Sequence, residues 1–371
     1  MKVCHLTSAH DSYDTRIFQK ECISLAERGG LEVFLVAPGK SRREKGVTVI
    51  GVGDKPENRL KRMTTFTHEV YKAAVSVNAE LYHFHDPELL PIGMKLKKDG
   101  KIVVFDSHEN TYLQIKVKPY LPVIVRKIVA ACYLKYEKHV CRHIDAVIYP
   151  ENNNPFKGIA KKTIIIDNLP IVEEFTPEET SVKKYDVCCT GSLTKERGIT
   201  VLLEASQKMN AKVVLAGEFS SEEYKSELEQ SGLLQNVDFK GYCSLREVKK
   251  ILAETKIAVS NIRWIGQYFL CDNLPTKVYE AMAMEVPVIL SDFPHYKKMV
   301  NKYGFGVCVN PDNPEDLAQK ISFLLSDDKL RLEMGKKGRK LIEEQFSWEK
   351  ERMKLFELYD ILKHEGNSLC I

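Results

Sequence analysis

Residues 272–289 read DNLPTKVYEAMAMEVPVI, and the predicted fold class follows from this stretch. A polar loop enters a helix near Pro275, a residue suited to a first helical turn, and the chain returns to a strand at 288–290. The free N–H groups and the dipole of the helix start form a natural site for a diphosphate. Lys277 adds a positive charge, and Glu280 can accept hydrogen bonds from two vicinal ribose hydroxyls. An ordinary capped helix with solvated Lys277 and Glu280 fits the spacing equally well.

A turn of similar character lies upstream, where residues 191–198 read GSLTKERG after a predicted strand. Lys195 and Arg197 can present positive charges to the same phosphates from this glycine-containing turn. A solvated, charged turn accounts for the segment equally well when it is taken alone. Chance rarely produces two such loops in consecutive βα units of one domain, so together they favour a nucleotide site.

The rest of the chain alternates short β-branched runs with amphipathic helices, which is typical of parallel α/β layers. Strands are predicted at 3–6, 33–37, 47–52, 81–85, 101–106 and 146–149, and then at 185–190, 211–216, 237–240, 257–260, 288–290 and 306–309. Helices are predicted at 17–28, 59–78, 120–143, 199–208, 221–231 and 244–253, and in a charged tail over 314–364. This pattern predicts two Rossmann-like halves. Since ligands bind at the carboxyl ends of parallel strands, we expect the loops of both halves to face a central cleft.

Length and composition fit a two-domain globular protein. The 371 residues are too many for one ordinary domain, and the 44% hydrophobic and 29% charged fractions exclude a disordered chain. The formal net charge of +4 gives no general preference for polyanions, so no nucleic-acid partner is expected.

The ten cysteines show no metal-ligand spacing, and the N-terminus reads as a strand rather than a secretory signal. We therefore expect free thiols in a reducing compartment. No stretch reaches the roughly 18 apolar residues of a membrane span. The sequence thus predicts a cytoplasmic protein that meets its substrates from solution or from the inner membrane surface.

The run 273–283 resembles the Glu-x7-Glu region of the retaining family-four glycosyltransferases, which have the GT-B fold. The turn 191–198 resembles the Gly-Arg-Leu-x3-Lys-Gly turn of that family. Similar stretches lie at 216–217, 237–242 and 346–349, so the resemblance covers nearly the whole chain and is strongest over 185–300. The resemblance implies an acceptor-binding domain over 1–165, a linker over 166–184 and a nucleotide-sugar domain over 185–345. It also implies a last helical segment, 346–371, that crosses back to the first domain.

The resemblance also implies roles for the residues of the second half. Asp272 would contact the hydroxyls of the donor sugar, Glu280 the ribose, and Arg197 the leaving diphosphate. The loop around Tyr242 and Cys243 would frame the nucleobase through backbone amides. The expected donor-binding residues are Gly191, Ser192, Arg197, Tyr242, Cys243, Asn273, Leu274, Pro275, Thr276 and Lys277.

The chain departs from the family pattern at four positions. Asp272 replaces the first glutamate, Ser192 replaces the first cation of the turn, and Arg197 replaces its lysine. Glu285 stands where a glycine is usual before the Pro-Val strand. We expect Lys277 to compensate for Ser192 at the diphosphate, and Asp272 to affect the choice of sugar.

Two histidine-bearing loops follow predicted strands of the first half, at 83–88 and 106–110. His108 matches a family histidine that touches the donor sugar and phosphate, where a neutral imidazole would donate a hydrogen bond. It is expected to be catalytic together with Asp272 and Glu280, although a histidine that caps the strand-to-helix turn fits as well. Alternation puts His83 and His85 on one face, yet no third ligand is in register, so no metal site is predicted.

Residues 8–16, SAHDSYDTR, form a polar loop after the first predicted strand. Asp14 and Arg16 either bind an acceptor sugar or organise this loop, and Arg16 fits a buried ion-pair partner equally well. His85 and Asp86 are the other expected acceptor contacts.

Residues 116–142 contain seven basic residues against the single acid Glu137. They are Lys116, Lys118, Arg126, Lys127, Lys135, Lys138 and Arg142, and they alternate with apolar residues. This alternation is typical of an amphipathic helix that rests on an anionic membrane, and equally of a core-packed helix with a solvated basic face.

The resemblance implies transfer of a sugar from a nucleoside diphosphate sugar, UDP-linked, to a saccharide or lipid-linked acceptor in cell-surface polysaccharide or glycoconjugate biosynthesis. Retention at the anomeric carbon and independence from metals and cofactors belong to the same expectation. Two alternatives stay open: a UDP-sugar 2-epimerase of the same architecture, and a nucleotide-sugar-binding partner subunit without catalysis.

Overall fold

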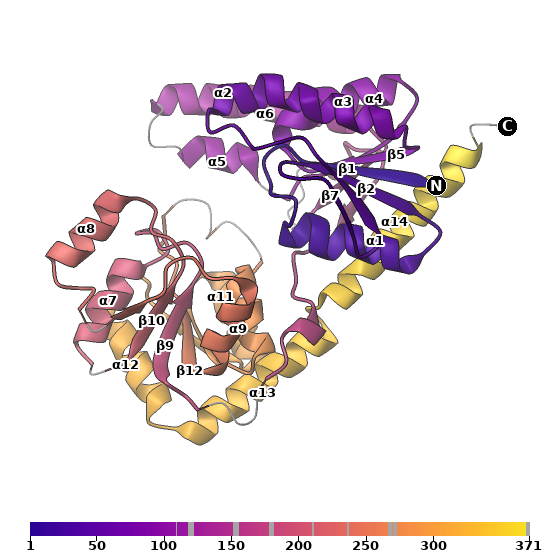
Figure 1. The fold of residues 1–371 in the computed structure, drawn as a ribbon. Helices are drawn as coiled ribbons and strands as arrows, with labels where there is room; N and C mark the ends of the chain where they lie inside the picture. Colours follow the sequence, from indigo (N-terminus) through magenta and orange to yellow (C-terminus); the bar gives the residue numbers. More distant parts are fainter. Residues whose placement is uncertain are drawn as a thin grey trace. The chain divides into compact units, whose positions relative to one another are not determined.

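The computed structural model describes residues 1–108, 110–117, 122–150, 156–177, 182–209, 211–235, 237–265, 269 and 273–368. The chain divides into two compact units (Figure 1). Unit 1 consists of Met1–Asn168 and Trp348–Ile371, and unit 2 of Leu169–Ser347. The expected cleft that both halves would face stays a prediction.

The sheet of unit 1 has the strand order β3-β4-β2-β1-β5-β6-β7-β8. Its strands are β1 (Lys2–Leu6), β2 (Glu32–Ala37), β3 (Arg42–Glu44), β4 (Val47–Gly51), β5 (Leu81–Phe84), β6 (Ile102–Asp106), β7 (Ala146–Tyr149) and β8 (Thr163–Ile165). All neighbours pair in parallel except β3 and β4. The six strands predicted for this half are confirmed, and the short edge strands β3 and β8 are additions.

The helices of unit 1 cover both faces of this sheet. They are η1 (Thr15–Cys22), α1 (Ile23–Arg28), α2 (Arg59–Lys61), η2 (Arg62–Phe66), α3 (Thr67–Val77), η3 (Pro87–Leu89), α4 (Leu90–Lys98), α5 (Thr111–Val117), α6 (Val123–His143) and α14 (Trp348–Ser368). The predicted helix 17–28 is confirmed, but its first part, η1, is a π-helix. The side chain of Asp14 starts η1 by accepting from the N–H groups of Arg16 and Ile17.

The last helix, α14, packs on unit 1 beside η1 and α1 (Figure 1). Its apolar side chains Leu355, Leu358, Tyr359 and Leu362 are buried. The indole N–H of Trp348 donates to Oγ of Ser24 over 2.9 Å, which satisfies the polar end of a buried ring.

The sheet of unit 2 is parallel throughout, with the order β11-β10-β9-β12-β13-β14. Its strands are β9 (Tyr185–Thr190), β10 (Val213–Ala216), β11 (Val237–Phe239), β12 (Thr255–Ser260), β13 (Val288–Ser291) and β14 (Gly306–Val309). Its helices are η4 (Val172–Glu174), α7 (Ile199–Gln207), α8 (Glu222–Gln230), α9 (Leu245–Ala253), α10 (Thr276–Ala283), α11 (Pro294–Tyr303), α12 (Pro314–Leu325) and α13 (Asp328–Glu344). Every strand predicted for this half is confirmed, and the α/β class with it.

Two apolar clusters hold the sheet of unit 2, one on each face. This double burial explains why its strands read as continuous apolar runs. Within the described ranges, no helix is both long enough and apolar enough to cross a membrane.

Candidate donor and catalytic site

Three glycine turns meet at the carboxyl edge of the unit 2 sheet. Gly191, Gly217 and Gly241 follow β9, β10 and β11 and have φ angles of +88°, +147° and +65°. The N–H of Gly191 donates to the Ala216 carbonyl over 2.8 Å, and the N–H of Gly217 to the Gly241 carbonyl over 2.7 Å. A Cβ atom on Gly217 would lie 1.9 Å from the Gly191 carbonyl oxygen, so the close approach of these loops requires glycine. The edge thus presents backbone rather than side chains to a ligand.

The two cations of the turn 191–198, Lys195 and Arg197, lie in different surroundings. Lys195 pairs with Glu227 of α8 at 2.7 Å, with both side chains about half exposed. Arg197 is partly buried, and its Nη1 lies 3.5 Å from the point where a Cβ on Gly191 would stand. Arg197 is therefore the cation of this turn that lies against the glycine edge, and Ser192 is exposed beside it.

The start of α10 lies at the same edge. Pro275 is its N-cap residue, and no described side chain caps the helix. Nζ of Lys277 lies 3.6 Å from Sγ of Cys189, near the end of β9, so the lysine reaches toward the glycine turn. Thr276 and Glu280 are partly buried. The structure thus brings Gly191, Arg197 and Lys277 together with the helix start, as a diphosphate site requires.

The remaining donor predictions have different outcomes. Leu274 is buried, and Asn273 is partly buried. Asp272 lies outside the described residues. Glu285 lies just after α10 and has a left-handed φ of +56°. Glycine adopts this conformation without strain, which explains why glycine suits the position.

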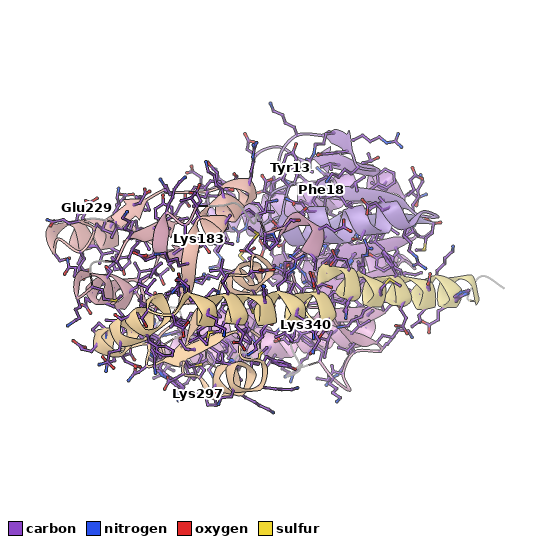
Figure 2. All side chains as sticks on the ribbon, turned by 90° about the horizontal axis from the view of Figure 1, so that it is seen from below. Tyr13, Phe18, Lys183, Glu229, Lys297 and Lys340 are labelled. Atoms are coloured by element: carbon purple, nitrogen blue, oxygen red, sulfur yellow. The ribbon has the colours of Figure 1, made fainter. Side chains whose placement is uncertain are left out.

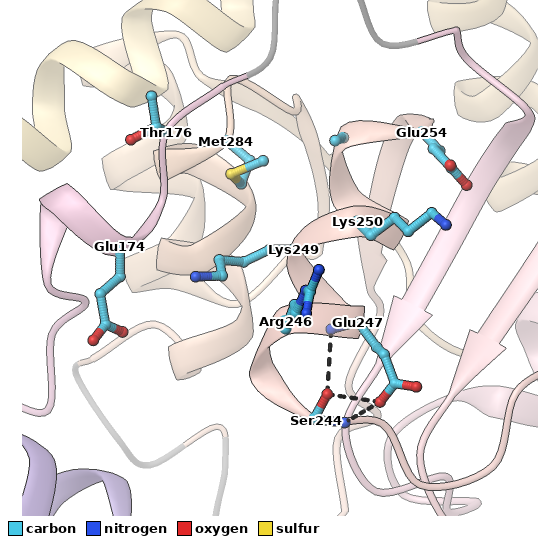
Figure 3. A pocket seen from close by; sticks show the side chains of 10 residues that line it. Glu174, Thr176, Ser244, Arg246, Glu247, Lys249, Lys250, Glu254 and Met284 are labelled. Carbon is cyan, nitrogen blue, oxygen red and sulfur yellow. Dashed lines mark hydrogen bonds between the residues drawn. The ribbon is translucent and has the colours of Figure 1, made fainter.

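The expected nucleobase loop is exposed, with Tyr242 78% accessible and Cys243 partly buried. It leads into α9, where Ser244 and Glu247 form a capping box. A polar hollow of about 800 Å³ lies beside α9 (Figure 3). It is lined by Glu174, Thr176, Ser244, Arg246, Glu247, Lys249, Lys250, Ala253, Glu254 and Met284, which include none of the predicted donor residues.

In unit 1, Asp106 at the end of β6 is the centre of a buried network. Its carboxylate accepts from Nε and Nη2 of Arg16 at 2.7 and 2.9 Å. Its Oδ2 lies 3.2 Å from Nδ1 of His85 and 3.1 Å from Nδ1 of His108. Although burial opposes ionisation, Arg16 and His108 hold the pKa of Asp106 well below its usual range. Asp106 is therefore the ionised acceptor of all three side chains.

Asp106 also orients the ring of His108. When Nδ1–H donates to the carboxylate, Nε2 of a neutral His108 carries no hydrogen and accepts a hydrogen bond. The expected hydrogen bond from His108 to the donor sugar and phosphate stays a prediction. Nε2 lies 3.4 Å from Nε2 of His10, a neighbour that the sequence did not single out.

Asp14 and Asp86 organise the first loop. Asp86 is 1% exposed, and its Oδ2 accepts from the N–H groups of Ser8 and Ala9 at 2.5 and 3.1 Å. Asp14 caps η1, and burial raises its pKa, but hydrogen bonds from His10 and the Ile17 N–H outweigh this and lower the pKa to about 2.

Next to the loop, the Arg42 guanidinium lies 3.6 Å from the centroid of the exposed Tyr13 ring, which also packs on Phe18 (Figure 2).

Arg16 and His85 are 3% and 2% exposed and have buried partners. Of the two interpretations of Arg16, the structure therefore places it as an ion-pair partner inside unit 1. The expected acceptor contacts of Asp14, His85 and Asp86 stay predictions. His5 and Glu21, which the sequence did not single out, lie against His83 and His85.

The family comparison matches the second half of the chain. Residues 172–341 match the model described as Glycosyl transferases group 1. An uncharacterized glycosyltransferase of Methanocaldococcus jannaschii is 28% identical over 176 residues, which are 46% of this chain and 43% of the relative. The chain spans about half the length of the curated relatives that it matches.

Solved structures match nearly the whole chain. Sucrose-phosphate synthase from Thermosynechococcus elongatus aligns with a TM-score of 0.78 at 17% identity, over 98% of this chain and 99% of that one. Anabaena HepE in complex with UDP and glucose aligns with a TM-score of 0.73 at 15% identity, over 97% and 99%. These likenesses confirm the predicted GT-B fold.

Proposed function

We propose that this chain transfers a sugar from a UDP-sugar to a saccharide or lipid-linked acceptor, with retention at the anomeric carbon. Its residues 172–341 match the Glycosyl transferases group 1 model. The observation that carries the proposal is the edge of unit 2, where the uncapped start of α10, the Gly191 turn, Arg197 and Lys277 meet. HepE, a protein of similar fold, was solved with UDP-glucose, which supports uracil as the base.

The donor diphosphate is held by protein groups without a metal ion in this proposal. The N–H groups at the start of α10 and the two cations Arg197 and Lys277 stabilise the charge that develops on the leaving diphosphate. Arg197 presents several N–H donors, and Lys277 supplies a point charge in place of the cation missing at Ser192. Glu280 binds the ribose hydroxyls. Asp272 contacts the sugar, as the resemblance implies.

His108 contacts the sugar and phosphate of the donor. The buried Asp106 carboxylate accepts a hydrogen bond from Nδ1 of His108 over 3.1 Å and fixes the orientation of the ring. A His108 ring that also carries a proton on Nε2 donates a hydrogen bond from that nitrogen to an oxygen on which negative charge grows as the sugar–phosphate bond breaks.

The acceptor side is proposed to work at an anionic membrane surface. The first turns of α6 expose Val123, Ile124 and Ile128 by 57%, 73% and 58%. Lys127 is exposed among them. A core-packed helix would bury such apolar side chains, whereas an interfacial helix presents them next to basic groups. A lipid-linked saccharide acceptor on the cytoplasmic face, in cell-surface polysaccharide or glycoconjugate synthesis, fits this surface.

A thermal-shift screen of nucleotide sugars, followed by mass analysis of products on saccharide and lipid-linked acceptors, tests the proposal. We expect a UDP-sugar to raise the Tm and the acceptor to gain the mass of one sugar, with an unchanged anomeric configuration by NMR. Interconversion of UDP-sugars without an acceptor would instead show the 2-epimerase. Donor binding without turnover on any acceptor would point to a partner subunit and overturn the proposal.

A further inference from the structure

Four buried side chains converge inside unit 1. His5, Glu21 and His83 are 0% exposed, and His85 is 2% exposed. His5 of β1 and His83 of β5 are register partners on neighbouring parallel strands. His85 lies two residues beyond His83 and therefore on the same face. Glu21 comes from the π-helix η1, a form that often marks functional sites.

The distances among these side chains are those of a common centre. One nitrogen each of His5, His83 and His85 lies 3.9 Å from Oε2 of Glu21. Nδ1 of His5 lies 3.0 Å from Nε2 of His85. Ligands of a tetrahedral zinc ion are about 3.3 Å apart, given zinc–nitrogen and zinc–oxygen bonds of about 2.0–2.1 Å. To reach that geometry, each nitrogen would approach Oε2 of Glu21 by about 0.6 Å, and the His5–His85 nitrogen pair would open by about 0.3 Å.

The buried carboxylate lacks the partners that its burial demands. Within the described chain, neither oxygen of Glu21 has a hydrogen-bond partner. Nδ1 of His83, the nitrogen 3.9 Å from Glu21, lies 2.9 Å from the hydroxyl of Tyr359 and would exchange that contact for the ion. Nε of Arg16 approaches Oε1 of Glu21 at 3.3 Å, but it lies closer to Asp106, at 2.7 Å. One guanidinium is thus shared between two carboxylates. A fully buried carboxylate without a hydrogen bond of its own is costly unless it is protonated or bound to a metal.

We propose that His5, Glu21, His83 and His85 form a structural zinc site at the centre of unit 1. Three imidazole nitrogens and one carboxylate oxygen are a ligand set that zinc accepts, and four protein ligands close the site as in structural centres. The site supplies no chemistry to the donor, because its ligands are enclosed.

The next shell of side chains has the form that orients metal ligands. Nδ1 of His85 donates to the Asp106 carboxylate at 3.2 Å, which directs its Nε2 to the centre. Nε2 of His5 lies 3.1 Å from the hydroxyl of Tyr359 on α14, which directs its Nδ1 there. Burial lowers the pKa of His5 and His83, so both rings are neutral, as ligation requires. Burial and Asp106 raise the pKa of Glu21, and a bound cation would reverse that.

The proposed ion would tie together distant parts of the chain. It connects β1, β5 and η1 directly and α14 through Tyr359. His85 also shares its carboxylate partner Asp106 with His108, so the ion fixes one side of the network that orients His108. No metal site was predicted because no third ligand is in register with His83 and His85, and His5 and Glu21 lie far from that pair in the sequence.

Elemental analysis of the full chain tests the site. Protein expressed with zinc supplementation and then desalted is expected to hold about one zinc per chain. The variants Glu21→Gln and His83→Gln should lose it, whereas His68→Gln, which changes an exposed histidine, should keep it. Circular dichroism establishes that each variant is folded. Retention of zinc by folded Glu21→Gln and His83→Gln, or a metal-free wild type that takes up no zinc on refolding, overturns the proposal.

A second measurement does not depend on variants that fail to fold. Wild-type protein refolded with cobalt in place of zinc should show the intense visible absorption of a tetrahedral ion and a higher Tm than the metal-stripped protein. A weak octahedral spectrum together with an unchanged Tm would show that the four side chains form a hydrogen-bonded cluster only. Neither readout requires transferase activity, so this proposal and the proposed function can fail independently.

Discussion

Oδ2 of the buried Asp106 lies 3.1 Å from Nδ1 of the partly exposed His108. A carboxylate that also accepts two hydrogen bonds from Arg16 thereby decides which ring nitrogen of His108 carries a proton. The relationship links the stability of unit 1 to the proposed chemistry, since one carboxylate serves both.

Replacing His108 with alanine is expected to lower kcat by about 10²- to 10³-fold, the usual loss for one hydrogen-bond donor to a developing negative charge. The Tm should stay near that of the wild type, because the side chain is partly exposed. Steady-state kinetics and differential scanning calorimetry give the two numbers, with His68→Ala as the control for loss of a histidine. Unchanged turnover would remove His108 from the mechanism.

Replacing Arg16 with methionine is expected to cost about 3–5 kcal/mol of unfolding free energy, because it leaves Asp106 buried without its cation. The matched control is Arg28→Met, which breaks the Arg28–Asp360 pair, whose side chains are 31% and 50% exposed. That change should cost less than about 1 kcal/mol. Urea titrations measure both. Equal losses of unfolding free energy in the two variants would show that the buried Arg16–Asp106 pair stabilises the fold no more than the exposed pair does.

Replacing Lys277 with alanine is expected to weaken UDP binding roughly 10- to 100-fold, as for one hydrogen bond to a charged group. Lys195→Ala should bind UDP like the wild type, because Lys195 pairs with Glu227 on the surface. Calorimetric titration compares the two. The compensation proposed for Ser192 fails if the two variants bind UDP equally well.

The double change Ile124→Glu and Ile128→Glu on α6 is expected to abolish co-sedimentation with anionic vesicles, since it removes apolar contact and adds repulsion. The control Leu332→Glu alters a side chain of unit 2 that is 65% exposed. It should sediment like the wild type. The membrane proposal does not survive if the wild type fails to sediment at low salt.

Asp14 is expected to make stability depend on pH at acid values. Its pKa is about 2 in the folded protein against an ordinary 3.8, so its contribution is present above pH 3.8 and is lost as the pH falls through 2. The cap is worth about 0.5–2 kcal/mol. The difference in unfolding free energy between wild type and Asp14→Asn should therefore shrink between pH 5 and pH 2. A difference independent of pH in that range would contradict the assignment.

The elements of both sheets could be predicted because parallel strands covered on both faces read as apolar runs bounded by polar loops. The edge strands β3 and β8 escaped prediction because each has three residues and little burial. The π-form of η1 could not be foreseen, since no side-chain pattern separates it from an α-helix of the same polarity.

The sequence could predict the glycine edge of unit 2 further than the buried network of unit 1. The grouping of Gly191, Arg197 and Lys277 could be predicted because these residues lie in two continuous segments, 191–198 and 273–280. The network of unit 1 was not, because Arg16 and Asp106 are 90 residues apart and His5 and His85 are 80 apart. They meet only through the strand order β1-β5-β6, which the sequence does not state.

Titration of UDP into wild type, Glu280→Gln and Lys195→Ala by calorimetry, without added divalent ions, tests the central claim most directly. We expect the wild type and Lys195→Ala to bind with the same affinity, and Glu280→Gln to bind at least about tenfold more weakly, because it loses a charged acceptor for the ribose hydroxyls. Equal affinity of all three proteins, or no binding by the wild type, would contradict a donor site at the start of α10.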